Sequence, residues 1–293
     1  MQSVPVTILG GSDRKPGVLP ESGGALHPLA TYKGVAIRLG GRPLIGWLVE
    51  RLLAAQGFGP VTIAGPARVY APLGLPARVL DTDASVARNL RAALEAQGSG
   101  PLAVLSCDVL PSVRELAELR ARYEEARPCA LWFPLVRVPK DHSELGAFAW
   151  KPEYTVVLDS GESVPILPGH LGILDPAQLR LPLLYRLLDD AYRTRNRSVS
   201  HRRGVMLRTV LFSPRSPLRT WRILASGLRL ARELRGGRLR LGDLERWIGR
   251  IFLAQGASGI HYPLVDMISL AEDIDTEEEA RAIHGEIEPL GTA

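Results

Sequence analysis

The stretch VPVTILGG, residues 4–11, contains an apolar, partly β-branched run that ends at a pair of glycines. Such a run is typical of a buried parallel strand, and Gly10-Gly11 would form the tight turn that follows it. Because glycine has no Cβ, this turn would let backbone N–H groups approach a negatively charged ligand closely. Glycine pairs also occur in purely structural turns, so the stretch alone does not decide between the two interpretations.

Strand-like and helix-like segments alternate along the chain beyond this stretch. A helical pattern over residues 42–57 begins near a proline and ends at a glycine, as helices commonly do. The other predicted elements are strands at 61–65, 77–80, 101–108, 130–138 and 154–158, helices at 85–97 and 113–126, and a terminal helix within 269–283. This alternation predicts an α/β fold with a doubly wound, mainly parallel sheet.

The composition is that of a folded globular protein, with 46% hydrophobic and 23% charged residues. The two cysteines, Cys107 and Cys129, are too few for a disulfide framework, and the six histidines lack the spacing of a zinc site. No segment has the pattern of an export signal or of a membrane span. We therefore expect a cytoplasmic protein.

Positive charge is concentrated in one part of the chain. Between Arg180 and Arg250 there are 18 arginines, no lysine and five acidic residues, a balance of +13 in a chain whose total is +5. We expect residues 176–255 to be a helical insertion within a single domain spanning residues 1–293. The segment either contacts phosphate groups of a small molecule or an anionic surface, or is simply a solvated face. Nucleic acid is the least favoured partner, because no aromatic stacking pattern accompanies the arginines.

Four features occur in a characteristic order: ILGGSDR at 8–14, Lys33 ahead of GVAIRLGGRPLIGWLVERL, SCD at 106–108, and EDIDTEEEARA at 272–282. Together they resemble the MobA-like nucleotidyltransferases, over most of residues 4–135 and 266–284. The resemblance implies a GT-A or Rossmann-like nucleotidyltransferase fold. It also implies an enzyme that transfers a nucleoside monophosphate from an NTP to a phosphorylated small-molecule acceptor and releases pyrophosphate.

The resemblance further implies roles for individual residues. The phosphate-binding loop would contain Leu9, Gly10, Gly11, Ser12 and Arg14. The catalytic lysine would be Lys33, although Lys15 in the same long loop is an alternative. The metal ligands for Mg²⁺ would be Asp108, Asp273 and Asp275. Carboxylates that meet over the carboxyl edge of a sheet suit this ion, which neutralises charge on phosphate oxygens.

Recognition of the base and ribose would fall to the segment after the third predicted strand. The candidates there are Asp81, Asp83, Ser85 and Asn89. Asp83 or Ser85 would equally serve as a helix cap. His170, in the PGHLG segment, is either near the acceptor or an ordinary loop histidine.

Two other functions are compatible with the same sequence. Asp81-Thr82-Asp83 has the DxD pattern with which GT-A glycosyltransferases hold a metal and an NDP-sugar. The protein would alternatively be a non-catalytic module that docks on an anionic surface through residues 180–250. The glycosyltransferase hypothesis predicts NDP-sugar binding that Asp81→Ala abolishes and Asp108→Ala leaves largely intact. The surface-binding hypothesis predicts association that depends steeply on salt.

Overall fold

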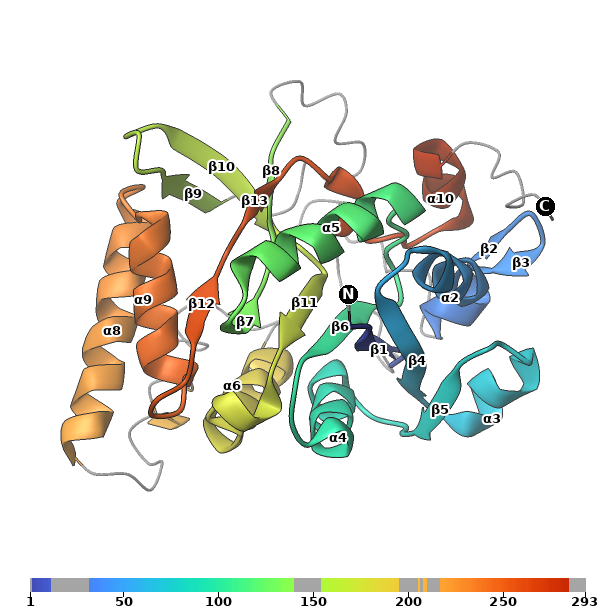
Figure 1. Ribbon diagram of the computed structural model, residues 1–293, viewed down its shortest axis with the longest axis horizontal. Coiled ribbons are helices and arrows are strands. Elements are labelled where there is room, and N and C mark those ends of the chain that lie inside the picture. The colour runs from blue at the N-terminus through green and yellow to red at the C-terminus, as the bar shows by residue number, and fades with distance from the viewer. Residues whose placement is uncertain are drawn as a thin grey trace.

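The computed structural model describes residues 2–11, 32–139, 154–194, 205, 208–209 and 217–284. These residues form a central, mostly parallel β-sheet with helices on both faces (Figure 1). The α/β fold expected from the sequence is thus confirmed.

The central sheet has seven strands in the order β12-β7-β11-β6-β1-β4-β5. Their bounds are β1 Val4–Leu9, β4 Phe58–Gly65, β5 Arg78–Asp81, β6 Leu102–Ser106, β7 Cys129–Trp132, β11 Leu171–Leu174 and β12 Gly259–His261. Strand β11 runs antiparallel to both of its neighbours, and the other pairs are parallel. Leu9 is in register with Ala64 of β4 and Ser106 of β6, so these three strands end close together at one edge.

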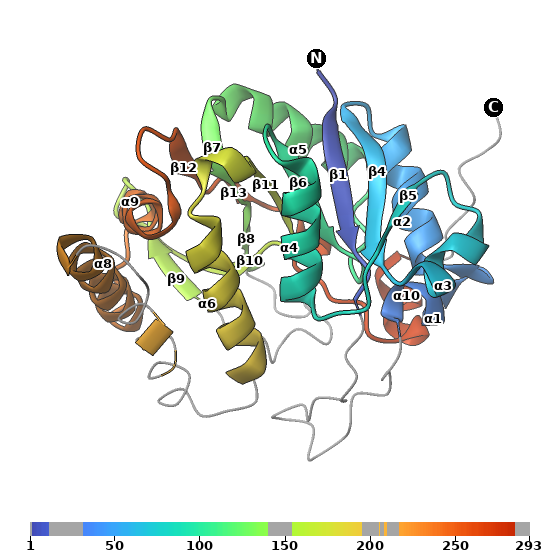
Figure 2. The ribbon, with the colours of Figure 1, turned by 90° about the horizontal axis from the view of Figure 1, so that it is seen from below.

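Two pairs of helices cover the faces of this sheet (Figure 2). On one face lie α2 (Leu44–Ala54) and α5 (Val113–Ala126), and on the other lie α4 (Val86–Gln97) and α6 (Leu181–Thr194). Helix α2 is largely buried, because seven of its residues, all apolar or glycine, fill the space against β4 and α5. Helix α5 begins with a capping box, in which Ser112 and Glu115 satisfy each other's backbone N–H groups.

A second sheet of four strands continues beside the first, in the order β13-β8-β10-β9. Its strands are β8 Leu135–Arg137, β9 Tyr154–Val157, β10 Ser163–Pro168 and β13 Leu264–Val265. The chain passes between the two sheets three times, from β7 to β8, from β10 to β11 and from β12 to β13. Two residues separate the strands at each crossing.

The crossing between β7 and β8 corrects one prediction. A single strand was expected over residues 130–138, but the segment forms two strands in different sheets. Pro134 lies between them and has no N–H group to donate, which interrupts the ladder of strand hydrogen bonds at that point. Hydrogen bonds from Gly169 N–H to Pro134 O (3.1 Å) and from Leu135 N–H to Pro263 O (2.9 Å) hold the three crossings side by side.

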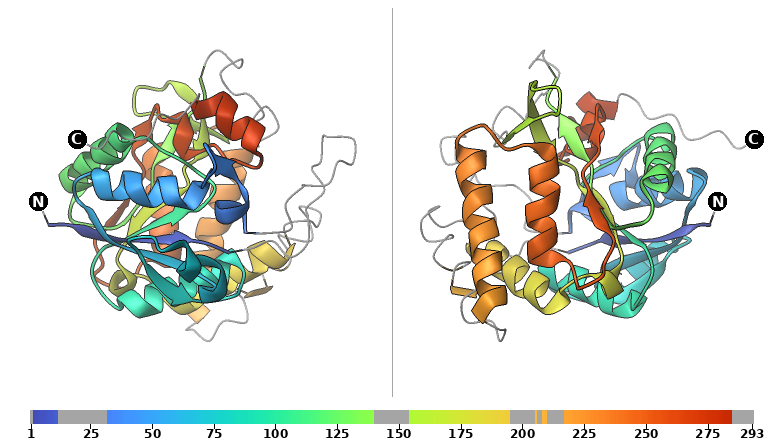
Figure 3. Two further views of the ribbon diagram at one scale, coloured as in Figure 1. Left: turned by 90° about the vertical axis from the view of Figure 1, so that its right-hand side faces the viewer. Right: turned by 60° about the vertical axis from the view of Figure 1, so that its left-hand side comes forward.

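The described part of the arginine-rich segment is mainly helical, as expected. After α6 it contains α8 (Pro217–Arg235) and α9 (Leu241–Phe252), which pack against each other (Figure 3). The apolar side chains of Leu183, Ile223 and Ile251 join α6, α8 and α9. The chain then returns to the edge of the central sheet as β12. Its status as an insertion within one domain, 1–293, stays a prediction.

The remaining described elements are short. They are α1 Lys33–Ala36, β2 Arg38–Leu39, β3 Arg42–Pro43, α3 Ala67–Tyr70, α10 Glu277–His284 and the 3-10 turns η1 Ala71–Leu73, η3 Pro176–Gln178 and η4 Ile268–Leu270. Within the described ranges, none of the helices is both long enough and apolar enough to span a lipid bilayer.

Candidate active site

The candidate site lies at the edge of the central sheet where β1 and β6 end. Asp108 follows β6 by two residues, Lys33 is the first residue of α1, and Asp273 and Asp275 lie between η4 and α10. The N–H of Ile274 donates to the carbonyl of Asp108 over 2.7 Å. This bond fixes the late segment against the end of β6, and so brings together residues that are far apart in the sequence.

Lys33 bridges two of these carboxylates. Its ammonium Nζ lies 3.4 Å from Asp108 Oδ2 and forms a second, closer ion pair with Asp275 Oδ1. All three side chains are mostly buried, with 21%, 17% and 16% of Lys33, Asp108 and Asp275 exposed. Burial by itself lowers the pKa of Lys33, but the charges of Asp108 and Asp275 outweigh it, so that pKa lies above its usual value of 10.5. Lys33 is therefore a permanent cation at neutral pH.

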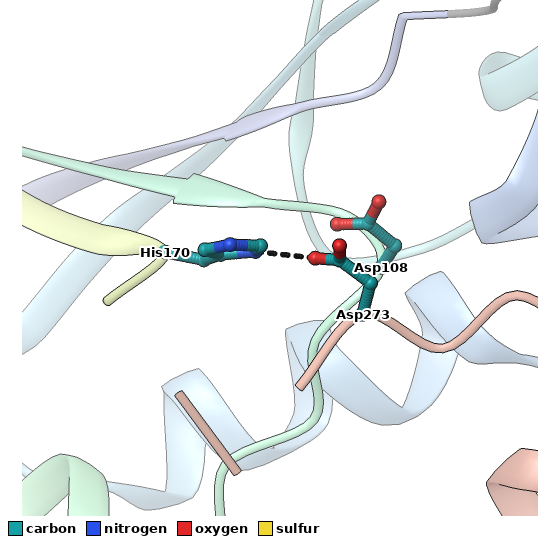
Figure 4. Close-up of side chains that lie close together, drawn as sticks. All are labelled: Asp108, His170 and Asp273. Atoms are coloured by element: carbon teal, nitrogen blue, oxygen red, sulfur yellow. Dashed lines mark ion pairs between the residues drawn. The ribbon is translucent and has the colours of Figure 1, made fainter. Parts of the chain in front are cut away.

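A second group, Asp108, His170 and Asp273, shares Asp108 with this bridge (Figure 4). The potential ligand atoms of its three members all lie within 4.8 Å of one another. His170 Nδ1 is 2.8 Å from Asp273 Oδ1, and the Ser106 hydroxyl donates to Asp108 Oδ1. Two carboxylates and one imidazole are donors that divalent cations accept, so the group fits a metal ion.

The structure thus brings together two of the three predicted metal ligands, Asp108 and Asp273. Asp275 instead forms the ion pair with Lys33 and is not a member of the three-residue group. The group includes His170, which sequence reasoning left as one of two alternatives. Its neighbour Gly169 is needed at the crossing, because a Cβ there would lie 2.9 Å from Pro134 O.

The acidic segment holds its shape through a helix cap. The Thr276 hydroxyl accepts from Glu279 N–H (3.0 Å), while Glu279 Oε2 accepts from the N–H groups of Thr276 (3.1 Å) and Asp275 (2.8 Å). This is the capping box that T-x-x-E forms at the start of a helix, here α10. The pattern EDIDTEEEARA therefore fixes the backbone that carries both aspartates.

Gly10 has a structural role in the turn after β1. Its N–H donates to Ala64 O and its carbonyl accepts from the Tyr70 hydroxyl, each over 2.9 Å. A Cβ on Gly10 would lie 2.7 Å from the buried Tyr70 ring, so only glycine fits there. Because the Gly10 N–H already belongs to the sheet, any N–H contact to phosphate falls to Gly11 and the residues after it.

The other predicted residues of this loop divide into two sets. Leu9 is buried among apolar side chains between the sheet and α4, so its side chain belongs to the core. Gly11 lies against α4: a Cβ there would be 3.0 Å from Asn89 Nδ2 and 3.2 Å from Ala84 O. Ser12, Arg14 and Lys15 lie outside the described residues.

The predicted base-binding residues lie at the end of β5 and directly after it, next to this turn. Asp81 Oδ1 accepts from Ala67 N–H over 2.7 Å and so caps α3. Asp83 accepts from the hydroxyl of Tyr32 (2.9 Å) and pairs with Arg68 (3.0 Å). Within the part of the chain that the structure describes, neither aspartate belongs to a group that could hold a metal. The geometry therefore gives the DxD interpretation no support.

Two further candidates lie on or beside α4. Ser85 occupies the cap position of this helix without a side-chain capping bond. Asn89 is fully buried and donates to Ala64 O over 3.3 Å, whereas its Oδ1 has no hydrogen-bond partner among the described residues. Asn89 thus connects α4 to the end of β4, close to Gly11.

No protein-family model matches the sequence, and no curated protein matches it. Among solved structures, the chain is similar over 95% of its length to 99% of a hypothetical transferase from Thermus thermophilus, with 23% identity and a TM-score of 0.57. It is also similar over 97% of its length to 98% of CMP:2-keto-3-deoxy-manno-octonic acid synthetase complexed with CTP, with 14% identity and a TM-score of 0.50. At these identities the likeness shows a common fold.

Proposed function

We propose that the protein is a metal-dependent nucleotidyltransferase of the MobA-like kind, which transfers a nucleoside monophosphate from an NTP to a phosphorylated small-molecule acceptor. One observation carries the proposal. Lys33 is held between Asp108 and Asp275, and Asp108 also belongs to a group that fits a divalent cation. Two kinds of positive charge would thus meet at the edge of the sheet, beside the turn at Gly11.

The reaction requires positioning and charge neutralisation more than covalent chemistry by the protein. An ionised phosphate oxygen of the acceptor attacks the α-phosphorus of the NTP, and a new P–O bond forms. The bond from the α-phosphorus to the bridging oxygen of the β-phosphate breaks, and pyrophosphate leaves with that electron pair. No proton has to be removed when the attacking oxygen is already ionised, so fixed cations carry much of the catalysis.

The protein's own residues have separate tasks in this scheme. Lys33 binds phosphate oxygens as a permanent cation, and its two carboxylate partners prevent the ammonium from turning away. Asp108, which accepts a hydrogen bond from the Ser106 hydroxyl, and Asp273 would hold Mg²⁺ or another divalent ion, which neutralises the charge of the phosphates when bound. The start of α4 at Ser85, together with Asp83, would contact the nucleoside, and the buried Asn89 would support this end of the helix.

Nucleotide binding can be tested without knowledge of the acceptor. Thermal unfolding is measured with ATP, GTP, CTP and UTP, each with and without Mg²⁺, for the wild type, Asp108→Asn and Asp266→Asn. The last variant is a matched control, because Asp266 is 82% exposed and pairs only loosely with Arg137, over 3.6 Å. A ligand at 100 times its Kd stabilises a protein by about 2.7 kcal/mol, which for a chain of this length raises Tm by about 4 °C.

The proposal expects one nucleotide to give this shift only when Mg²⁺ is present. Asp108→Asn should lose the shift and Asp266→Asn should keep it. Release of pyrophosphate in a panel of phosphorylated acceptors then identifies the second substrate. A cooperatively unfolding wild type that responds to none of the four nucleotides refutes the proposal.

A second proposal concerns the arginine-rich segment, which we infer contacts an anionic lipid surface. On α8, Trp221 and Leu228 are 68% and 64% exposed and lie two helical turns apart, each followed by an exposed arginine, Arg222 and Arg229. Tryptophan and leucine next to arginines suit the boundary of a membrane with negatively charged headgroups. Two copies of this face would repel each other, which disfavours a dimer through α8. Figure 1 places α8 at the opposite side of the molecule from α10, away from the candidate site.

A further inference from the structure

His170 occupies an unusually fixed point of the chain. It lies at the crossing from β10 to β11, where its N–H donates to Leu270 O (2.7 Å) and its carbonyl accepts from Ser106 N–H (3.1 Å). One bond ties it to η4, just ahead of Asp273, and the other ties it to the last residue of β6, just ahead of Asp108. The backbone of His170 is thus fastened to both segments that supply the carboxylates.

The antiparallel direction of β11 explains why His170 reaches this edge. If β11 ran parallel to β6, the residue just before its first residue would lie at the opposite edge of the sheet, where the parallel strands begin. Since β11 runs opposite to β6, with Leu171 in register with Leu105, its beginning lies at the carboxyl edge, beside Asp108. In Figure 4 the side chains of Asp108, His170 and Asp273 come from three separate segments and gather at one point.

The distances suit a shared ligand. Neighbouring ligand atoms around a six-coordinate ion with bonds of about 2.1 Å lie about 3.0 Å apart. The 2.8 Å between His170 Nδ1 and Asp273 Oδ1 is close to this value. Asp108, the third member, has its ligand atom within 4.8 Å of both, so the three side chains surround one point.

We propose that His170 is a protein ligand of the metal ion, and that its imidazole makes the site prefer Mn²⁺ or Co²⁺ to Mg²⁺. The inference rests on the proposed function, since it concerns the metal of the same site. Carboxylates and water suit Mg²⁺ well, whereas an imidazole nitrogen adds affinity for later first-row ions. A site with only carboxylates from the protein would discriminate less between these ions.

The opposing interpretation is that His170 only orients Asp273 through their 2.8 Å contact, as an outer partner of the site. Such a partner improves the binding of any divalent ion, without a nitrogen bonded to the metal. Direct ligation differs in two measurable ways: the nitrogen is magnetically coupled to Mn²⁺, and its loss changes the ratio of Mn²⁺ to Mg²⁺ affinity.

The experiment uses the full chain and Mn²⁺ itself as the probe. Binding is followed by electron paramagnetic resonance, competition with Mg²⁺ gives the affinity ratio, and electron spin echo modulation detects a coordinated ¹⁴N. The variants are His170→Ala, His170→Gln and Asp108→Asn. His261→Gln is the matched control, because His261 also faces a carboxylate, Glu245, over 3.3 Å but lies outside the site. Near-ultraviolet circular dichroism checks that each variant is folded. If His170→Ala does not fold, His170→Gln serves in its place, because glutamine keeps a polar side chain.

We expect tighter binding of Mn²⁺ than of Mg²⁺ by the wild type and by His261→Gln, with ¹⁴N coupling in both. Each His170 variant should lose the coupling and weaken Mn²⁺ binding at least about tenfold, with a smaller effect on Mg²⁺. Any of three results would overturn the inference: no Mn²⁺ binding, no ¹⁴N coupling in the wild type, or an unchanged ratio of Mn²⁺ to Mg²⁺ affinity in the folded variants. If the protein still transferred nucleotides with Mg²⁺, the proposed function would stand without the inference. Conversely, coupling from His170 in a protein that binds no NTP would support the ligand and refute the function.

Discussion

Replacement of Lys33 by methionine should destabilise the protein by a predictable amount. Methionine keeps much of the apolar stem but leaves Asp108 and Asp275 without their shared cation. Loss of one partner from a buried ion pair costs about 3–5 kcal/mol, and we take about 3 kcal/mol because Lys33 is partly exposed. With an unfolding entropy of about 2.1 cal/mol/K per residue over 293 residues, this corresponds to a fall in Tm of about 5 °C.

Two further measurements test the same reasoning. Added Mn²⁺ should raise the Tm of Lys33→Met more than that of the wild type, because the metal compensates carboxylates that have lost their ammonium. The stability difference between the two proteins should also be constant from pH 6 to 9. A raised pKa in the folded state means that the stabilising proton is fully bound below the usual value of 10.5, so the contribution fades only above that pH.

The control is Arg91→Met, which removes an ion pair with Glu95, whose side chains are 57% and 52% exposed, and a cation–π contact with Tyr185. Exposed interactions of these kinds together contribute about 1 kcal/mol, so its Tm should fall by about 2 °C at most. Differential scanning calorimetry or circular dichroism measures all three proteins. If Lys33→Met melts within 1 °C of the wild type, or if Mn²⁺ stabilises both equally, the ion-pair reasoning is wrong.

Three other outcomes follow from the structure. Gly10→Ala should lower Tm, because its Cβ would lie 2.7 Å from the Tyr70 ring. The same substitution made in a Tyr70→Ala background should lower Tm by less, and an equal fall in both backgrounds would exclude the clash as the cause. Burial raises the pKa of the Cys107 thiol to about 12 and that of Cys129 to about 11. At pH 8 a disulfide reagent should therefore modify both cysteines slowly in the native protein and rapidly in urea. Fast labelling of the native protein would contradict this. Binding to vesicles of anionic lipid through residues 180–250 should weaken steeply with salt and be absent with neutral lipid; equal binding to both would exclude the electrostatic explanation.

The parallel part of the fold was predictable, because its signals are local. The apolar run before Gly10 and the helical pattern of α5 depend on neighbouring residues. The convergence of Asp108 with Asp273 followed from the family resemblance. The hydrogen bond between Ile274 and Asp108 makes this convergence visible in the structure.

Two features were not predictable from the local pattern. The ALWFPLVRV segment is uniformly apolar, and only the pairing partners on either side of Pro134 show that it belongs to two sheets. His170 reaches the site because β11 is antiparallel, a property that depends on the global strand order. The sequence of a short apolar strand does not show its direction, so the sequence alone left His170 with two interpretations, one near the acceptor and one as an ordinary loop histidine.

The number of residues in the crossing at Gly169-His170 also determines which way the His170 side chain points. Successive residues of an extended chain point to opposite faces, so one residue added between His170 and Leu171 would turn the His170 imidazole away from Asp108 and Asp273. Exchange of the second sheet for that of another protein should therefore be made by splicing within β8 and β10. This protein's own two-residue crossings then stay unchanged.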